Sequence, residues 1–415
     1  MAPGTERQNG TDYLTSAAGE DREGPIYGQP KTQFWWCNLI HIFNDGYITS
    51  LALLLPFIAA NLDLNYTQSG ALKSAINGSI SAAQIPAGLL SEHIGEILIL
   101  GLGTAWFSLS YVAVLLASTY TLLLILILVS GIGGGVYHPV GTALISNVFP
   151  PEKSGPAIGT LNFFGDVGKV IFPALTGLLV VALGWRGSFA MLGGIGLVVS
   201  VLYLFFFRRE ISRKRRQIAR EKEQNRTEKG WGIKKPVQFA LYTIIGFLDV
   251  TIRSAVTAFL GFLLLEEIGV GKEYLGWLIS LTFLGGAMGK LLCGMPIRRF
   301  GEKRIILFTE LLMILGCWTL PSIPPGWVLV LFLPLFGFML NGTSSVIYIG
   351  LAPTFEAERR SRGYALYFTL NFFASAVAPA LFGLVADAFS LDTLFYAAGA
   401  TMLLGLPLVM FLKDD

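Results

Sequence analysis

The sequence at residues 173–178 is Pro-Ala-Leu-Thr-Gly-Leu, and at residues 379–384 it is Pro-Ala-Leu-Phe-Gly-Leu. The two segments are 206 residues apart, and other residues repeat at the same distance. These pairs are Gly88 and Gly294, Gly95 and Gly301, Glu96 and Glu302, and Phe149 and Phe355. Chance rarely keeps one register over several loops and helices, so the sequence predicts two structurally equivalent halves.

The composition of the 415-residue chain indicates a membrane protein. Apolar residues make up 53% of the chain and charged residues only 14%, whereas soluble domains are about 25% charged. This balance argues against a soluble enzyme, a nucleic-acid-binding protein and a disordered chain. The length suffices for a dozen membrane-spanning helices of about 20 residues each.

Long apolar segments recur between polar breaks and predict twelve transmembrane helices, six in each half. The predicted spans are 34–60, 68–91, 97–117, 121–146, 156–180, 187–207, 237–265, 273–296, 303–322, 326–350, 362–388 and 391–412. The predicted fold is an all-α membrane protein in which two six-helix bundles are related as internal repeats.

The polar segments predict the domain boundaries. They are a cytoplasmic tail over 1–33, an N-terminal bundle over 34–207, a basic linker over 208–236 and a C-terminal bundle over 237–415. We expect a charged, partly helical linker, with contact to anionic lipid headgroups as an alternative role. The tail does not resemble a cleavable signal peptide, because no short apolar core is followed by a small-residue cleavage site.

The positions of Lys and Arg predict the orientation. They gather in the tail, the linker and the other loops on the same side, and few lie in the loops on the opposite side. Since cytoplasmic loops carry an excess of Lys and Arg, both termini are expected in the cytoplasm. Short tails and loops favour a bacterial inner membrane.

The loop after the second helix of each half resembles a motif of the major facilitator superfamily, G-x-x-x-D-R-x-G-R-R. The first copy runs Gly88-Leu-Leu-Ser-Glu92-His-Ile-Gly95 and the second Gly294-Met-Pro-Ile-Arg298-Arg-Phe-Gly301. The glycines fit, and the first copy lacks the basic residues. The resemblance implies the major facilitator fold, with alternating access to a site between the bundles and with these residues in conformational roles.

Within the superfamily, the chain most resembles the fosmidomycin-resistance-type exporters. The matching segments are His41-x-x-Asn44-Asp45, Leu55-Pro56, Gln68-x-Gly70, Gln84-x-Pro86 and Gly131-x-Gly133-x-x-Val-Tyr-His138-Pro139. The fifth helix also matches four of six positions of an antiporter pattern, at Gly159, Gly168, Pro173 and Gly177. An Arg that this superfamily associates with proton coupling is absent before the glycines of the fourth helix.

Six charged residues inside the predicted spans are candidates for function, because a charge in the bilayer centre costs several kcal/mol. They are Asp45, Asp166, Asp249, Lys169, Arg253 and Lys290. Three acids balance three cations, so structural ion pairs are the alternative. Asp166 with Lys169 and Asp249 with Arg253 have helical spacing for such pairs. Lys290 could instead extend toward the cytoplasmic surface.

His41 and Asp45 are the first candidates for proton coupling, with Asp166 and Asp249 as further candidates. His41 lies one helical turn before Asp45, and imidazole exchanges protons near neutral pH. Such a pair could take up a proton on one side of the membrane and release it on the other. The alternative is that the two side chains hydrogen-bond each other and fill a polar gap between helices.

Polar side chains inside the spans are the predicted substrate-binding residues. They are Asn44, Gln84, His138, Asn162, Lys169, Arg253, Asn341 and Asn371. Cationic groups suit the oxygens of a carboxylate or phosphonate. A structural role is the alternative for the amides, which need partners when buried, and a hinge role for His138, because Pro139 removes a backbone hydrogen bond.

The expected function is a proton-coupled antiporter that exports a small anionic or amphipathic compound. Two alternatives stay open: a proton- or sodium-coupled importer of an organic anion, and a membrane receptor that kept the fold without transporting. The cysteines and histidines lack metal-ligand spacing and no nucleotide loop is present, so no catalytic residue, no metal and no cofactor other than a coupling proton is expected. The expected partners are a small molecule and lipid, without nucleic acid, and the expected state is a monomer.

Overall fold

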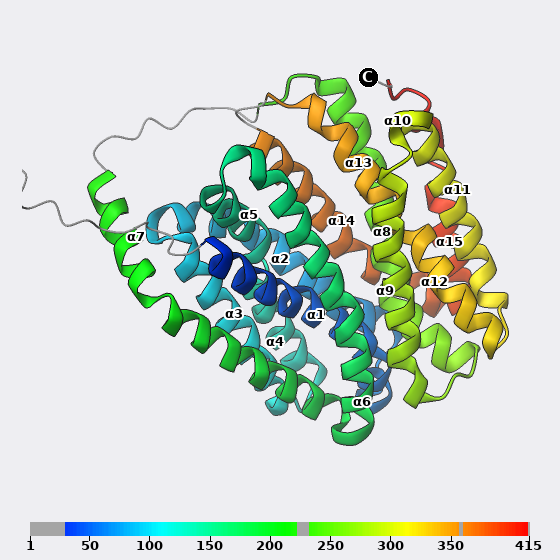
Figure 1. Ribbon diagram of the computed structural model, residues 1–415. Coiled ribbons are helices and arrows are strands. Elements are labelled where there is room, and N and C mark those ends of the chain that lie inside the picture. The colour runs from blue at the N-terminus through cyan, green and yellow to red at the C-terminus, as the bar shows by residue number, and fades with distance from the viewer. Residues whose placement is uncertain (1–29, 222–231, 357–359, 414–415) are drawn as a thin grey trace, which may run out of the picture.

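The computed structural model describes residues 30–221, 232–356 and 360–413, and helices make up most of them (Figure 1). The first half contains α1 (Pro30–Leu62), α2 (Tyr66–Ile94), α3 (Glu96–Ala113), α4 (Tyr120–Gly134), α5 (Tyr137–Val148) and α6 (Pro151–Phe206). The second contains α8 (Pro236–Phe262), α9 (Lys272–Gly294), α10 (Ile297–Phe300), α11 (Glu302–Thr319), α12 (Trp327–Asn341), α13 (Thr343–Leu351), α14 (Arg360–Ala388), α15 (Leu391–Met402) and α16 (Leu406–Val409). Figure 1 shows the halves as two bundles side by side, with α7 (Arg208–Glu221) between them in the chain.

The helices account for twelve membrane crossings. Ten segments of the described chain are long and apolar enough to cross a membrane. One of them, Pro156–Phe206, has 51 residues, about twice the length that one crossing needs. It divides at Gly184, whose φ of 67° is a conformation that glycine adopts readily. The remaining crossing is α2, which has 29 residues and a more polar sequence. The predicted fold class is thereby confirmed.

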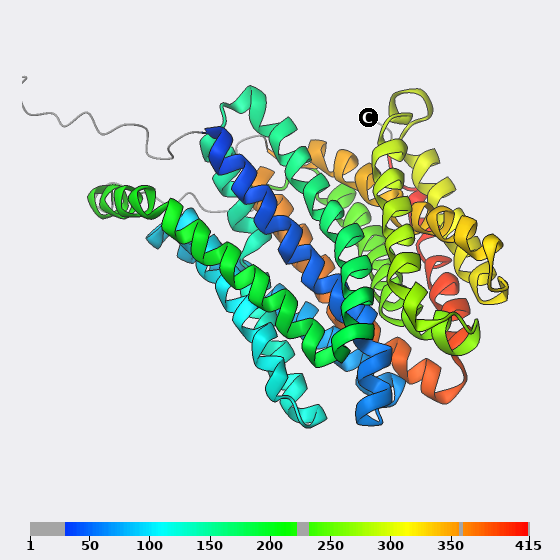
Figure 2. The ribbon, with the colours of Figure 1, turned by 60° about the horizontal axis from the view of Figure 1, so that its bottom comes forward.

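Some predicted boundaries differ in the structure. Helix α1 begins at Pro30, so 30–33 are helical rather than part of the tail, and 1–29 lie outside the described residues. Of the predicted linker, α7 is helical as expected and 222–231 lie outside the described residues. Figure 2 shows α7 at the edge of the N-terminal bundle, beyond the end of α6.

Two predicted spans are interrupted at equivalent places. The span 121–146 consists of α4 and α5, and the span 326–350 consists of α12 and α13. Helix α5 begins at Tyr137 and α13 at Thr343, which are separated by the repeat distance. Pro139 and Gly342 lie at these breaks. Proline removes a helical hydrogen bond, and glycine destabilises a helix because its backbone is freer than that of other residues.

We call the end where α1 and α8 begin the linker end and the opposite end, where α2 begins and α14 finishes, the outer end. At the outer end the two copies of the repeated segment hold the bundles together. A Cβ added at Gly177 of the first copy would lie 2.7 Å from Cα of Gly276 in α9. In the second copy, the Pro379 carbonyl would clash with a Cβ added at Gly70 of α2. Gly70 and Gly276 are themselves related by the repeat, so one packing contact occurs twice.

A carboxylate also joins the bundles at the outer end. Asp387, at the end of α14, accepts hydrogen bonds from the backbone N–H groups of Tyr66 and Thr67, each at 2.9 Å, and from the Thr67 hydroxyl. The first N–H groups of a helix have no partner within the helix, and the helix dipole favours an anion there. The start of α2 is thus capped by the opposite bundle.

Candidate functional site

The candidate site begins where α1 and α6 approach each other around two glycines. A Cβ added at Gly165 would lie 2.6 Å from Nε2 of His41 and 2.7 Å from Oδ2 of Asp45. A Cβ at Gly168 would clash with the Ile42 carbonyl. The glycines therefore give His41 and Asp45 their space and place the polar face of α6 next to them.

Four residues form a row of alternating charge across the two bundles, which we call the charge ladder: Asp45, Lys169, Asp166 and Lys290. Nζ of Lys169 lies 2.9 Å from Oδ2 of Asp45 and 3.1 Å from Oδ1 of Asp166. Nζ of Lys290 lies 2.6 Å from the same Asp166 oxygen. The ladder runs from α1 through α6 to α9, so its last ion pair crosses from one bundle to the other.

The acids and the cations of the charge ladder differ in exposure. The side chains of Asp45 and Asp166 are 4% and 12% exposed, and those of Lys169 and Lys290 are 30% and 26% exposed. The cations of the ladder are therefore more accessible than the acids that hold them.

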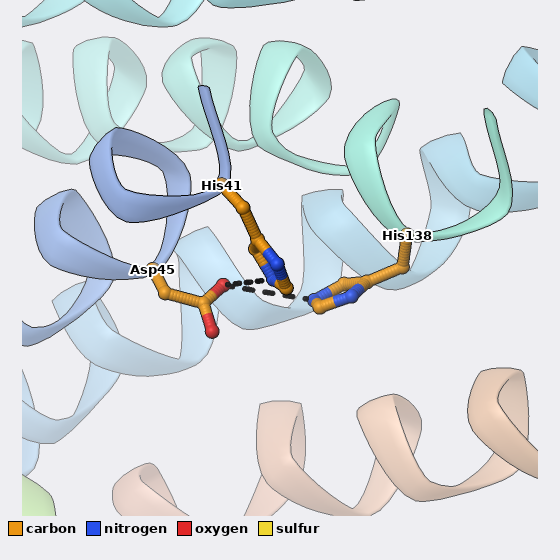
Figure 3. A group of neighbouring side chains, drawn as sticks. All are labelled: His41, Asp45 and His138. Atoms are coloured by element: carbon orange, nitrogen blue, oxygen red, sulfur yellow. Dashed lines mark ion pairs between the residues drawn. The ribbon is translucent and has the colours of Figure 1, made fainter. Parts of the chain in front are cut away.

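Two histidines adjoin the ladder at Asp45 (Figure 3). Nε2 of His41 lies 3.5 Å and Nε2 of His138 lies 3.8 Å from Oδ1 of Asp45. Nδ1 of His41 lies 2.6 Å from the Leu161 carbonyl oxygen, which can only accept, so Nδ1 carries a hydrogen. A proton shared with Asp45 must therefore sit on the carboxyl or on Nε2 of an imidazolium. The arrangement is able to hold one proton between buried groups.

A second charged group lies in the C-terminal bundle. Nη2 of Arg253 lies 2.6 Å from Oδ2 of Asp249, and its Nη1 donates to Oδ1 of Asn341 at 3.5 Å. The Asp249 side chain is 1% exposed and that of Arg253 is 18% exposed. This pair resembles the pairs of the ladder in one respect: the side chain of the cation is more exposed than that of its acid.

The other predicted substrate residues fall into two sets. Asn44 donates to Oδ1 of Asp45 at 3.3 Å and so belongs to the first cluster. Gln84 is buried, Asn162 is exposed, and Asn371 is buried and donates to the Tyr367 carbonyl at 2.8 Å. Among the described residues, no hydrogen bond or ion pair joins these three to either charged group. Their roles stay predictions.

Sequence reasoning missed the contacts that join separate helices. The ion pairs within α6 and within α8 have the spacing that the sequence indicates, but the pairs of Asp45 with Lys169 and of Asp166 with Lys290 do not. Lys290 therefore pairs across the bundles rather than extending toward the membrane surface. Lys73, which lies within the predicted span 68–91 but is not among the predicted site residues, is buried at 4% exposure and donates to the Ile48 carbonyl at 3.0 Å.

The predicted conformational residues are spread over both bundles. Gly95 and Gly301 follow their helices with φ of 96° and 77°, which other residues rarely adopt. An added Cβ would have only ordinary contact at Gly88 and Gly294, and open space at Gly159. Pro173 is buried, Glu92 is exposed, and Arg298 lies in α10 with its side chain outside the described residues.

The histidines and Asp45 also form a donor set for a metal ion. One ligand atom each from His41, Asp45 and His138 lies within 4.8 Å of the others, and a carbonyl bond to the second ring nitrogen of His41 is typical of metal-binding histidines. Lys169 already brings a positive charge to Asp45. The sequence-based expectation of a site without metal stays a prediction.

A model of the Major Facilitator Superfamily matches residues 35–248 and 242–415. The chain belongs to the Major Facilitator Superfamily. Membership identifies it as a multi-pass membrane protein and a secondary transporter of the major facilitator type, not an enzyme. The finer resemblance to fosmidomycin-resistance-type exporters is a separate matter and stays a prediction.

Several relatives match most of this major facilitator. The hexuronate transporter of Bacillus subtilis is 24% identical over 84% of this chain and 87% of its own length. The 4-hydroxybenzoate transporter of Acinetobacter baylyi is 26% identical, with 85% of each chain covered. The probable sulfoacetate transporter of Cupriavidus necator is 25% identical, over 88% of this chain and 89% of its own.

Solved structures match the major facilitator fold as well. A POT family transporter in complex with 5-aminolevulinic acid gives a TM-score of 0.73 at 13% identity and covers 93% of this chain and 96% of that one. A bacterial homologue of the human lysosomal transporter Spinster, in an inward-facing and occupied conformation, gives 0.71 at 15% identity, with 94% and 96% covered. At such identities the likeness concerns the fold alone.

Proposed function

We propose that this major facilitator takes up a small organic anion together with protons. The observation that carries the proposal is the charge ladder, in which buried acids hold partly exposed cations and the last pair joins the two bundles. Three relatives are named for transport of hexuronate, 4-hydroxybenzoate and sulfoacetate, all of which are anions at neutral pH. The proposed substrate is therefore a carboxylate or sulfonate of similar size.

Competition for Lys169 would couple the proton to the anion. While Asp45 and Asp166 are ionised, both carboxylates neutralise Lys169. A proton on Asp45 removes one of these charges and leaves Lys169 available to a substrate carboxylate. An unpaired charge in a buried site costs several kcal/mol, so the proton and the anion stabilise each other's binding. We propose a proton, rather than sodium, as the coupling ion.

The histidines would provide the route by which the proton reaches Asp45. The His138 side chain is 27% exposed, whereas that of His41 is 2% exposed. Their rings meet edge to face at 5.4 Å between centroids. The more exposed His138 would receive the proton from outside the cluster, and His41 would hold it next to Asp45.

The contacts at the outer end support a conformation closed on that side. Gly70, Gly177 and Asp387 all bind the opposite bundle there. We propose that the linker end faces the cytoplasm of a bacterial cell and that release of the anion occurs at this end. We propose that a monomer carries out this transport.

The test is transport into liposomes that contain the purified protein, with glucuronate, 4-hydroxybenzoate and sulfoacetate as probes. An inward proton gradient should drive accumulation of at least one probe, and Asp45→Asn should abolish the response to the gradient while exchange of the probe across the membrane persists. Glu273→Gln, an exposed acid of the outer end, serves as the control. Probe-driven proton movement in the opposite direction would identify the exporting antiporter instead.

A further inference from the structure

Glu310 is a buried acid that the proposed transport scheme does not use. It lies in the middle of α11, and its side chain is 0% exposed. Neither of its carboxylate oxygens has a hydrogen-bond partner in the described part of the chain. Buried polar groups are almost always paired, and an unpaired buried carboxylate costs several kcal/mol. An ionised Glu310 without compensation would be unstable there.

In the described part of the chain, one acid and one cation act on Glu310, and the acid, Asp249, is also acted on by Lys290 of α9. Asp249 and Arg253 of α8 interact with it electrostatically, Thr343 of α13 is a polar neighbour, and Cys317 lies on its own helix. Helices α10, α12, α13, α15 and α16 also pack against α11. Their charged residues are Arg298 and Arg299 of α10, at the linker end, and Asp392 in the first turn of α15, at the outer end. Tyr348 and Tyr367 face Arg253 from α13 and α14.

The charges of this group balance only when one proton is present. The guanidinium of Arg253 is occupied by Asp249, at 2.6 Å. With both acids ionised the group carries one net negative charge, and with one proton it is neutral. The equivalent position in the first half is Thr104, so the repeat gives the N-terminal bundle no such acid.

We propose that Glu310, together with Asp249, binds a proton in the C-terminal bundle, and that this proton removes the net negative charge that would otherwise repel a substrate anion from Arg253. Loss of the proton leaves two carboxylates around one guanidinium, and their net negative charge repels an incoming anion. Affinity for the anion is therefore full while the proton is bound and falls as the pH rises through the titration of the acid pair. The effect on the substrate anion at Arg253 rests on the proposed function, whereas the proton site of Glu310 and Asp249 does not.

Infrared spectroscopy of the full-length protein in liposomes tests the proton directly. A protonated carboxyl has a carbonyl band separate from the bands of carboxylates. The wild type should show this band at neutral pH, and Glu310→Gln should remove it. Asp249→Asn should remove it as well, because one acid is then left for one guanidinium. The control Glu273→Gln should keep it. An unchanged band in Glu310→Gln would overturn the proposal.

Transport kinetics test the effect on the anion. With whichever of glucuronate, 4-hydroxybenzoate and sulfoacetate the wild type transports, KM should rise about 10-fold per pH unit above the titration of the acid pair. Glu310→Gln mimics the protonated acid in size and shape, so its KM should lose the part of this rise that comes from the acid pair, while kcat and the pH dependence that comes from Asp45 persist. A wild-type pH profile of KM in this variant would refute the role at Arg253.

The two measurements separate the failure of this proposal from that of the proposed function. Loss of the band in Glu310→Gln, in a protein that moves none of the three probes, supports the proton site and counts only against the proposed function. Transport with an unchanged band supports the proposed function and counts against the proton site. Thermal unfolding of each variant verifies that it is folded.

Discussion

Both the proton step at Asp45 and the binding of the anion depend on Lys169 in the proposed coupling. It is the only cation that contacts Asp45 through an ion pair in the described chain, apart from the two histidines. Lys169→Gln should leave Asp45 buried without a cation, which costs about 3 kcal/mol for a pair whose cation keeps 30% exposure. The same variant should lose anion transport, because the substrate loses its ammonium group.

A second substitution distinguishes the two effects of Lys169→Gln. In the double variant Asp45→Asn with Lys169→Gln the buried charge is gone, so thermal stability should largely return while transport stays absent. Melting temperatures of the single and double variants measure the coupling of the pair. A Lys169→Gln protein as stable as the wild type would show that the ion pair with Asp45 is not formed.

Single residues of the site could be predicted from the sequence, and their partners could not. A charge inside an apolar span is visible without a structure, as with Asp45, Asp166 and Lys169. Glu310 gives the same signal within the span 303–322 and is absent from the predicted set. The pairing of Lys290 with Asp166 was not predictable, because it depends on how the two bundles meet. The distance between these two residues in the sequence does not indicate whether they are in contact.

At the scale of helices, the contact of α14 with the start of α2 should control opening of the outer end. Asp387→Ala removes the acceptor of two backbone N–H groups and one hydroxyl. The loss of about 1–2 kcal/mol should raise the population open at the outer end about 5- to 30-fold. Labelling of Ser74→Cys by a membrane-impermeant thiol reagent measures this population, since Cys37, Cys293 and Cys317 are buried.

The control for Asp387→Ala is Glu273→Ala, in which an acid of the same end is removed without loss of a described contact to the opposite bundle. Its labelling rate should match that of Ser74→Cys alone. Equal rates in Asp387→Ala and in the control would mean that the cap on α2 does not hold the outer end closed.

Helix positions were largely predictable because apolar length and glycine placement determine them. The predicted spans differ from the helices mainly where a helix is interrupted. The break between α12 and α13 at Gly342 falls in the short polar run 341–345, Asn-Gly-Thr-Ser-Ser, which is too short to divide the predicted span 326–350. The repeat indicates two equivalent halves, but the outer contacts of Gly177 and Pro379 were not predictable from it, because they depend on how the two bundles meet.

At the scale of the whole molecule, transport by alternating access requires the outer end to open. The Ser74 hydroxyl accepts a hydrogen bond from the Ala380 backbone N–H at 3.1 Å, so the two backbones are close. Oxidation of the double variant Ser74→Cys with Ala380→Cys should form a disulfide that stops transport, and reduction should restore it. The single variants control for oxidation itself. Transport that continues in the cross-linked protein would exclude the opening.

The polar character of α2 has a consequence for the assembly of the protein in the membrane. Its side chains bind partners in the other bundle: Asn77 donates to the Ser375 carbonyl at 2.9 Å and Ser81 to that of Thr369 at 3.2 Å. These partners belong to α14, which begins at Arg360, whereas α2 ends at Ile94. At ordinary rates of synthesis the ribosome needs roughly 15–50 s to cover that distance. For that time the nascent α2 has to be sheltered by the insertion machinery or by its own bundle, so we expect quality-control proteases to recognise this helix first in a chain whose second half is late or defective.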